Sequence, residues 1–203
     1  RGLHSGLKTG LILEPLPPDS GIHFGNLTNP ETIPADVMFV DNTNYSTNLR
    51  YGSVSARTIE HLMSALYAYG ITNLLIKIGA EVPIMDGSAK VFIDKFLEVG
   101  FDISETPIKL IKINKKVEIE DGSKHISIDK TNVSLEIDFE IKFNNSFIGN
   151  QRRKINIYES DLSDIFNSRT FCLYEDVEKL KKMNLARGGS LENAIAVSYT
   201  HLT

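Results

Sequence analysis

Glu60 and His61 stand side by side near the start of residues 55–70, a stretch whose apolar spacing predicts a short amphipathic helix. Adjacent side chains on a helix point about 100° apart, so His61 could hold a metal ion while Glu60 reaches a water molecule beside it. Metal hydrolases divide the work in this way, because the metal lowers the pKa of the water and a carboxylate takes its proton. The competing interpretation is a surface glutamate beside a half-buried histidine, since this dipeptide also occurs by chance.

The predicted helix around this pair has one apolar face. Thr58 is the expected N-cap, with Ser55 as the alternative. Gly70 is expected to end the helix, because glycine readily takes the left-handed conformation that follows a last turn. Apolar side chains recur at three- and four-residue spacing, which indicates a buried face made of Ile59, Leu62, Met63, Leu66 and Tyr69.

The composition is that of a globular protein. Of the 203 residues, 41% are hydrophobic, which is enough to bury a core in one or two domains. The formal net charge of −4 argues against non-specific binding of nucleic acid. The single cysteine, Cys172, excludes an internal disulfide framework and a multi-cysteine zinc site. No apolar run is long enough to cross a bilayer, so we expect no transmembrane segment.

The order of the predicted elements indicates an α+β fold. In the first half, strands precede the helix that carries Glu60, and a strand at 73–78 and a helix at 89–99 follow it. A boundary is expected near 103–107, after which the pattern restarts with strands and a hairpin turn at Asp121-Gly122. We therefore predict two layered α/β-sandwich domains of similar architecture, residues 1–105 and 106–203, with the second domain incomplete.

The other histidines do not complete an obvious metal site. His125 and Asp129 are four residues apart, but they fall on a predicted strand, where that separation is about 13 Å. His4 lies in a glycine-flanked turn and could line a site or simply face solvent. His23 is expected to be structural, and His201 stands close to the end of the chain.

Thr170 is the remaining candidate for chemistry. Its hydroxyl follows a loop and could donate to a developing oxyanion, although bonding to nearby backbone is the commoner use of such a group. Cys172 lies among apolar residues and is expected to pack as a small hydrophobe. The sequence shows no Ser-His-Asp spacing, no phosphate-binding P-loop and no dinucleotide fingerprint.

Five segments in this order resemble one family. They read GLHSG at 2–6, TIEHLMSAL at 58–66, PIMDGSA at 83–89, SRTF at 168–171 and GGSLENA at 188–194. Together they resemble the UDP-3-O-acyl-N-acetylglucosamine deacetylases of lipid A biosynthesis in Gram-negative bacteria. The resemblance runs from Gly2 to about Val197.

The resemblance implies a zinc-dependent amidase. Such an enzyme removes acetate from a UDP-linked, acylated N-acetylglucosamine, which is the committed step towards lipid A. It also implies two α+β domains with the active site between them, a cytoplasmic location, a monomeric state and no nucleic-acid partner.

By position, the resemblance assigns the catalytic residues. It makes His61 a zinc ligand and Glu60 the general base that activates the zinc-bound water. It makes Thr170 the hydroxyl that stabilises the tetrahedral oxyanion.

Three further residues are assigned to substrate binding. Phe171 matches an aromatic side chain near the sugar, and Leu3 and His4 match a loop that lines the catalytic cleft. Residues 188–197 lead into the family's acyl-chain passage, and Asp86 lies in a turn whose role is expected to be structural.

The chain also departs from the family's pattern. It starts without Met, and the family's His-Lys-x-x-x-Asp helix and later histidine general acid, which carry the other zinc ligands and the acid, do not occur in it. We therefore expect a chain truncated at both ends, with a foreign tail from about residue 198, little or no activity on its own, and exposed apolar sheet in its second half. The alternative is a non-catalytic α+β binding module in which Glu60-His61 is incidental.

Overall fold

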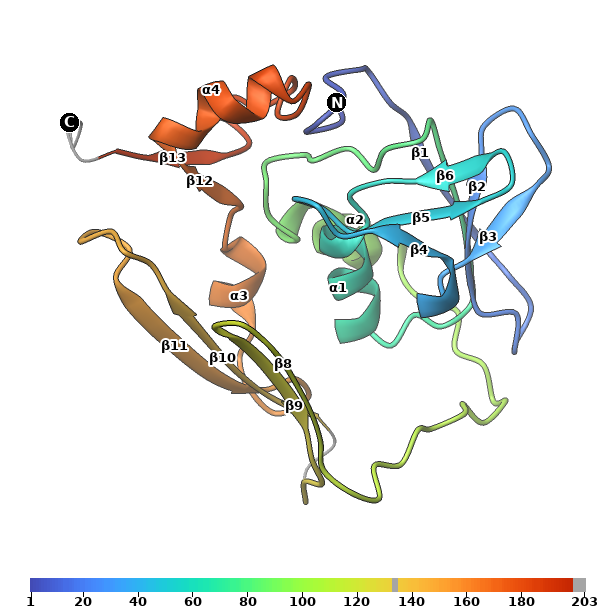
Figure 1. The fold of residues 1–203 in the computed structure, drawn as a ribbon. Coiled ribbons are helices and arrows are strands. Elements are labelled where there is room, and N and C mark those ends of the chain that lie inside the picture. Colours follow the sequence, from blue (N-terminus) through green and yellow to red (C-terminus); the bar gives the residue numbers. More distant parts are fainter. Residues whose placement is uncertain (133–134, 199–203) are drawn as a thin grey trace. The chain divides into compact units, whose positions relative to one another are not determined.

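The computed structural model describes residues 1–132 and 135–198 (Figure 1). Helices and several small sheets alternate along the chain, which confirms the predicted α+β class. The chain forms two compact units. One contains Arg1–Ser104 and the segment that starts at Ser163, and the other is Glu105–Leu162.

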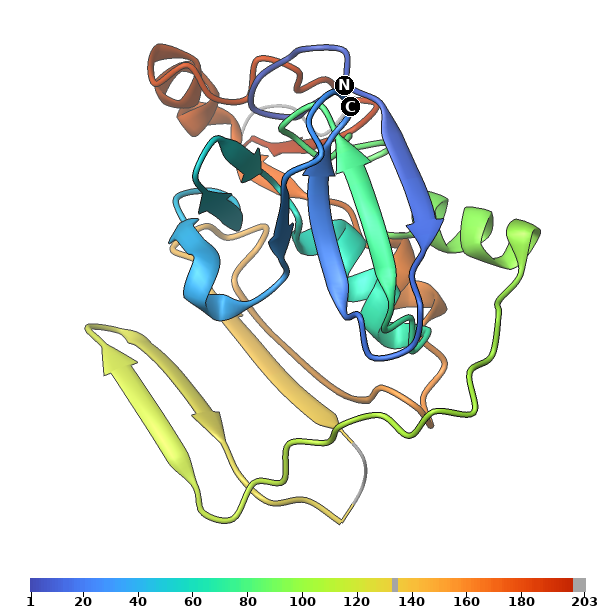
Figure 2. The same ribbon diagram turned by 90° about the vertical axis from the view of Figure 1, so that its right-hand side faces the viewer.

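A four-stranded sheet is the centre of the first unit. Strand β7 (Leu74–Ile78) lies between β1 (Leu11–Pro15) and β2 (Ile22–Asn26), and β3 (Thr32–Pro34) pairs with β2 at the far edge. Strand β7 runs antiparallel to β1 and parallel to β2. Figure 2 shows these strands side by side, with a helix behind them.

The side chains of β7 alternate between a buried and a partly exposed face, as expected of a strand with one face on the core. Helices α1 (Glu60–Ala68) and α2 (Lys90–Val99) contribute to the same core. The core residues from these three elements are Leu74, Ile76 and Ile78 from β7, Leu62, Ala65 and Leu66 from α1, and Phe92, Ile93 and Phe96 from α2. Burial of this face fixes the orientation of α1, and with it the direction of Glu60 and His61.

A second sheet leads directly into α1. It contains β4 (Val40–Asn42), β5 (Asn48–Tyr51) and β6 (Val54–Ala56), with the short 3-10 helix η1 (Val37–Phe39) before β4. Only Arg57, Thr58 and Ile59 separate β6 from α1. The loop between β4 and β5, residues 43–47, therefore belongs to the same region as the start of the helix.

The C-terminal segment of this unit is a βαβ arrangement. After α3 (Ser163–Asn167), β12 (Phe171–Leu173) leads into α4 (Tyr174–Lys182), and β13 (Ile195–Val197) returns parallel to β12. Helix α4 has acidic side chains in its first turn and lysines in its last turn, a distribution that suits the helix dipole.

The second unit contains two antiparallel hairpins. Strand β8 (Val117–Asp121) pairs with β9 (Lys124–Ile128), and β10 (Glu136–Lys142) pairs with β11 (Asn150–Asn156). The hairpin predicted at Asp121-Gly122 is present, and Gly122 has φ +58°, a value that favours glycine. Side chains of β8 and β9 are exposed on both faces.

The predicted boundary near residue 105 coincides with the first division between the units. The residues from Ser163 onward group with the N-terminal unit, whereas the prediction placed them with the strands of 106–162. The assignment of residues 1–105 and 106–203 to two similar domains stays a prediction. The predicted foreign tail falls almost entirely on residues 199–203, which lie outside the described residues. In residues 1–132 and 135–198, no helix is long and apolar enough to cross a membrane.

Candidate functional site

The start of α1 has an unusual backbone. Thr58 has φ +56°, which is rare for a β-branched residue because its side chain crowds the backbone there. The prediction that Thr58 caps the helix was wrong. Ile59 is the N-cap residue and makes no side-chain capping bond, and the Thr58 hydroxyl donates instead to Oε1 of Glu81 at 3.2 Å.

The Glu60 carboxylate is held by the loop between β4 and β5. Its Oε2 accepts a hydrogen bond from the backbone amide of Thr47 at 3.0 Å. The carbonyl of Thr47 in turn accepts from the amide of Ile59 at 3.2 Å. Within the described residues, Oε1 of Glu60 has no hydrogen-bond partner, which leaves this oxygen for a water molecule or substrate.

His61 is half-buried on the first turn of α1. Burial lowers the pKa of its imidazole below the ordinary value of 6.5, although the negative charges of Glu60 and Asp86 oppose this effect. The ring is therefore neutral at neutral pH, the form in which imidazole binds metals. Among the described residues, no group forms a hydrogen bond with either ring nitrogen, so the side chain can act as a ligand.

Asp86 lies in the turn before α2. Its negative charge acts on the His61 imidazole, which indicates that this turn is close to His61. Oδ1 of Asp86 accepts hydrogen bonds from the Ser88 amide at 3.0 Å and the Ser88 hydroxyl at 2.8 Å. Burial raises the pKa of Asp86, but these two bonds and the positive charge of Arg169 outweigh it and hold the pKa below its usual value. These bonds support the structural role predicted for Asp86.

The segment that carries Thr170 is bonded to this turn. Arg169 donates from Nε to the carbonyl of Asp86 at 2.7 Å, and the Thr170 amide donates to the carbonyl of Gly87 at 2.8 Å. The Thr170 carbonyl accepts from the amide of Ile195 at 3.0 Å, which ties β12 to β13. The turn at Asp86 thus connects the surroundings of His61 to the segment that carries Thr170 just before β12. Phe171, the next residue, is partly exposed.

The N-terminal loop packs against residues 186–188. Nδ1 of His4 accepts from the Ala186 amide at 3.3 Å, so Nε2 carries the proton and donates to the carbonyl of Tyr45 at 3.2 Å. The carbonyl of Leu3 accepts from the Gly188 amide at 2.9 Å. His4 is buried and both of its ring nitrogens are engaged with backbone, so it fixes the loop. Contact of Leu3 or His4 with a substrate stays a prediction.

Glu81 was not found from the sequence. Only 2% of this residue is exposed, and its carboxylate accepts hydrogen bonds from the amides of His4 at 2.8 Å and Ser5 at 2.9 Å. With the bond from Thr58, these contacts join the N-terminal loop to the residues before Glu60. A lone glutamate beside a Val-Pro pair carries no sequence signal for this role, because its donors lie 23 and about 76 positions away.

Backbone strain gathers around the same region. The non-glycine residues Tyr45, Thr58, Ala80, Met85 and Ala186 all have φ between +52° and +86°. Four of them have carbonyls or amides in the contacts of this region. Tyr45 and Ala186 bond to His4, Ala80 accepts from the Arg57 amide, and the Thr58 amide donates to Asn48. Strain of this kind persists where surrounding contacts fix the backbone, and it clusters at functional sites.

The described residues contain no cluster of three or more His, Cys, Asp or Glu side chains arranged to hold a metal ion. A cavity of about 330 Å³ is lined by residues of β4–β6 and the loops beside them and by Met183 and Leu185. It has none of Glu60, His61 or Thr170 in its wall.

Comparison with known proteins matches the whole chain, residues 1–203, to the family model of the UDP-3-O-acyl N-acetylglycosamine deacetylases, LpxC. The chain belongs to this family. It is 44% identical over 198 residues to the UDP-3-O-acyl-N-acetylglucosamine deacetylase of Nautilia profundicola, covering 97% of this chain and 68% of the relative. The enzyme of the same name from Myxococcus xanthus is 43% identical over 203 residues, covering 97% and 63%. That of Haemophilus ducreyi is 41% identical over 203 residues, covering 97% and 66%. The chain thus spans about two thirds of the length of these relatives.

Proposed function

We propose that the protein to which this chain belongs hydrolyses the acetamide of UDP-3-O-acyl-N-acetylglucosamine and releases acetate, as part of lipid A biosynthesis. Membership of the family supports the reaction. The observation that carries the proposal is the pairing on α1 of a backbone-held carboxylate, Glu60, with a neutral imidazole, His61, that has a pKa lowered by burial.

His61 would hold a zinc ion. Its neutral, half-buried ring, with nitrogens that bond to none of the described groups, suits this use. When bound, zinc lowers the pKa of a water molecule and polarises the carbonyl of an amide. Catalytic zinc takes about three protein ligands, so we propose that residues 1–203 alone hold it weakly and have little activity.

Glu60 would act as the general base. The Thr47 amide orients its carboxylate through Oε2, and Oε1 is the oxygen that would take a proton from the attacking water. The fixed geometry matters because proton transfer requires the acceptor within hydrogen-bonding distance of the proton.

Thr170 would stabilise the oxyanion that forms when water attacks the amide carbon. Its amide and carbonyl are both engaged with neighbouring backbone, which fixes the residue and leaves its hydroxyl to contact the substrate. Phe171 would lie near the sugar, and the loop of Leu3 and His4 would line the catalytic cleft. Zinc, a Gram-negative source, a cytoplasmic location and a monomeric state stay predictions that follow from the resemblance.

Acetate release from UDP-3-O-acyl-N-acetylglucosamine, measured on the protein expressed from its complete gene, tests the reaction. We expect turnover that a chelator abolishes and added zinc restores. The 203-residue chain, purified alone, is expected to bind much less than one equivalent of zinc. Turnover that is unaffected by exhaustive metal removal would contradict the zinc mechanism, and no acetate release at all would contradict the reaction.

A further inference from the structure

The carboxylate of Glu81 is buried where two segments of the proposed site meet. Burying an ionised carboxylate is unfavourable unless hydrogen-bond donors surround it. Burial raises the pKa of Glu81, but the Ser5 hydroxyl and the amides of His4 and Ser5 outweigh it and hold the pKa below its usual value. Glu81 is therefore ionised at neutral pH, and its donors come from two separate parts of the chain.

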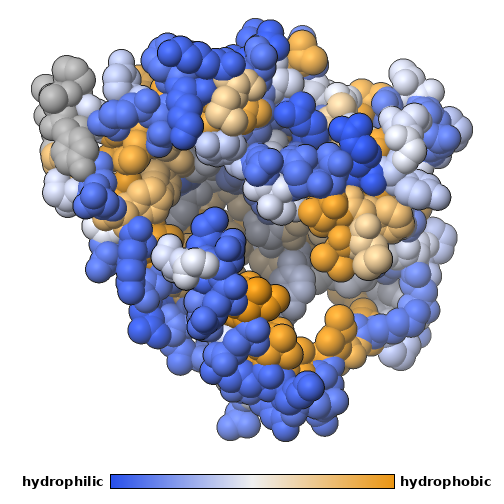
Figure 3. Space-filling model, viewed as in Figure 1, coloured by the Kyte–Doolittle hydropathy of each residue, from blue (hydrophilic) through white to orange (hydrophobic). Residues whose placement is uncertain are grey.

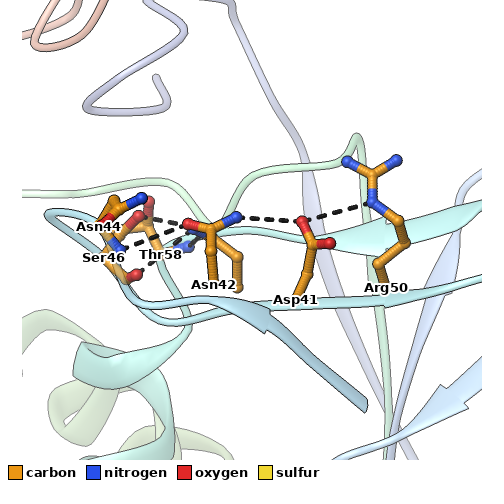
Figure 4. Close-up of polar contacts among 7 residues, drawn as sticks. Asp41, Asn42, Asn44, Ser46, Arg50 and Thr58 are labelled. Carbon is orange, nitrogen blue, oxygen red and sulfur yellow. Dashed lines mark hydrogen bonds and ion pairs between the residues drawn. The ribbon is translucent and has the colours of Figure 1, made fainter.

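The first part is the residue before the helix cap. Thr58 is 2% exposed and has a left-handed backbone, and two hydrogen bonds hold it there. Its amide donates to Oδ1 of Asn48 at 3.2 Å, and its hydroxyl donates to Glu81 at the same distance. A polar chain supports the Asn48 side, because Asn42 accepts from Asn48 and donates to Asp41. Figure 4 shows the bond between Asn42 and Asp41.

The left-handed turn at Thr58 sets the direction in which α1 begins. Ile59 and Glu60 follow it at once, and both bond to Thr47, the residue before Asn48. If the Thr58 backbone relaxed to an ordinary conformation, Ile59 and Glu60 would move away from Thr47. The bond from Thr58 to Glu81 thus acts on the position of Glu60 without touching it.

The second part is the N-terminal loop. The consecutive amides of His4 and Ser5 both point at the Glu81 carboxylate. Gly2 packs so closely on this carboxylate that a Cβ atom there would collide with it. One side chain therefore fixes the loop of Leu3 and His4 and also the backbone before Glu60.

We propose that Glu81 is a positioning residue for the deacetylation, which sets the catalytic base on α1 and the substrate loop at residues 3–5 in register with each other. The inference rests on the proposed function for the roles of Glu60 and of the loop. The coupling of the two segments through Glu81 rests on the hydrogen bonds alone.

Glu81→Gln in the protein expressed from the complete gene tests the contact of Glu81 with Thr58 and its contact with the amides of His4 and Ser5. Glutamine keeps the shape but replaces one acceptor oxygen by an NH2 group that faces a donor. We expect kcat to fall by about 10- to 100-fold, because small displacements of a catalytic group have effects of this size. We also expect KM to rise.

Glu31→Gln is the matched control. The Glu31 carboxylate also accepts from a hydroxyl, that of Ser53, but at an exposed site. A kcat for Glu81→Gln equal to that of the control would overturn the proposal.

Thr58→Val and Thr58→Ser separate the helix contact from the loop contact. Valine removes the hydroxyl but keeps the branched shape, and serine keeps the hydroxyl. We expect Thr58→Val to lower kcat with KM unchanged, and Thr58→Ser to restore kcat. Equal kcat values for the two variants would overturn the proposed role of this bond. The comparison remains valid if Glu81→Gln fails to fold.

Amide hydrogen exchange on the purified chain provides a readout that needs no activity and no metal. In Thr58→Val, faster exchange is expected at Thr47, whose amide is held by Glu60, by about tenfold. In Glu81→Gln, the amides of His4 and Ser5 should also exchange faster. Unchanged exchange would overturn the coupling. If exchange changes as expected but the wild-type protein releases no acetate, the proposed function fails and the coupling stands.

Discussion

The backbone amide of Thr47 donates a hydrogen bond to Oε2 of Glu60 at 3.0 Å. Because the donor is a main-chain group, it is fixed by the fold of the β4–β5 loop and not by the identity of residue 47. Glu60→Asp shortens the side chain by one methylene and is expected to lower kcat by about 10- to 100-fold. Thr47→Ala keeps the donor and should leave kcat close to that of the wild type. Steady-state kinetics of both variants provide the test. A lower kcat for Thr47→Ala than for Glu60→Asp would contradict the proposed role of this hydrogen bond.

Gly87 is expected to be essential for the close contact between the Asp86 turn and the backbone of Asn193. It has φ +88°, and a Cβ atom there would collide with the carbonyl of Asn193. Gly87→Ala should therefore reduce the free energy of unfolding by more than the roughly 1–2 kcal/mol of a left-handed alanine alone. Gly52→Ala is the control, since Gly52 has φ +56° and open space around its Cα. Urea denaturation that gave equal losses for the two variants would show that the contact with Asn193 is unimportant.

The stability of the chain should depend on the ionisation of Glu81 in acid. Its pKa in the folded protein lies below the ordinary 4.5, so the unfolded chain takes up the proton first as the pH falls. The resulting stabilisation is complete well above 4.5 and is lost as the pH falls through the lower folded value. The difference in unfolding free energy between wild type and Glu81→Gln should shrink over this window. A difference that stays constant with pH would mean that folding does not lower the pKa of Glu81, so that its donors do not stabilise the ionised carboxylate.

The hairpin of β8 and β9 should bind hydrophobic dyes in the purified chain. Val117 faces Ile128, and Ile119 faces Ile126 across the strands. Between 47% and 67% of each of these four side chains is exposed, and Figure 3 shows apolar side chains at the surface over this hairpin. Replacing Ile119 and Ile126 by threonine, a good strand former, should reduce the fluorescence of such a dye. Unchanged fluorescence would place the dye-binding surface elsewhere.

The elements of the fold were largely predictable from local patterns. The apolar spacing of Leu62 and Leu66 indicated α1, and the Asp121-Gly122 pair indicated the β8–β9 turn, because these signals depend on residues close in sequence. The grouping of the residues after Ser163 with the N-terminal unit depends on contacts such as Thr170 to Gly87. No local pattern encodes a pairing between residues so far apart.

The site was predictable only in part for the same reason. Glu60 and His61 are adjacent, so their types and the helical pattern were enough to indicate them. Thr58 was misinterpreted as a cap because a threonine before a helix usually has that role. Its actual partner, Glu81, lies 23 residues further on and became visible only once the chain was folded.

Glu60 as the general base is the central element of the proposed mechanism. Glu60→Gln keeps an oxygen that can accept from the Thr47 amide, but it cannot take a proton. In the zinc-loaded protein expressed from the complete gene, we expect acetate release to fall by about 10²- to 10⁴-fold while the zinc content is retained. Acetate release at the wild-type rate by a fully zinc-loaded Glu60→Gln protein would contradict the account.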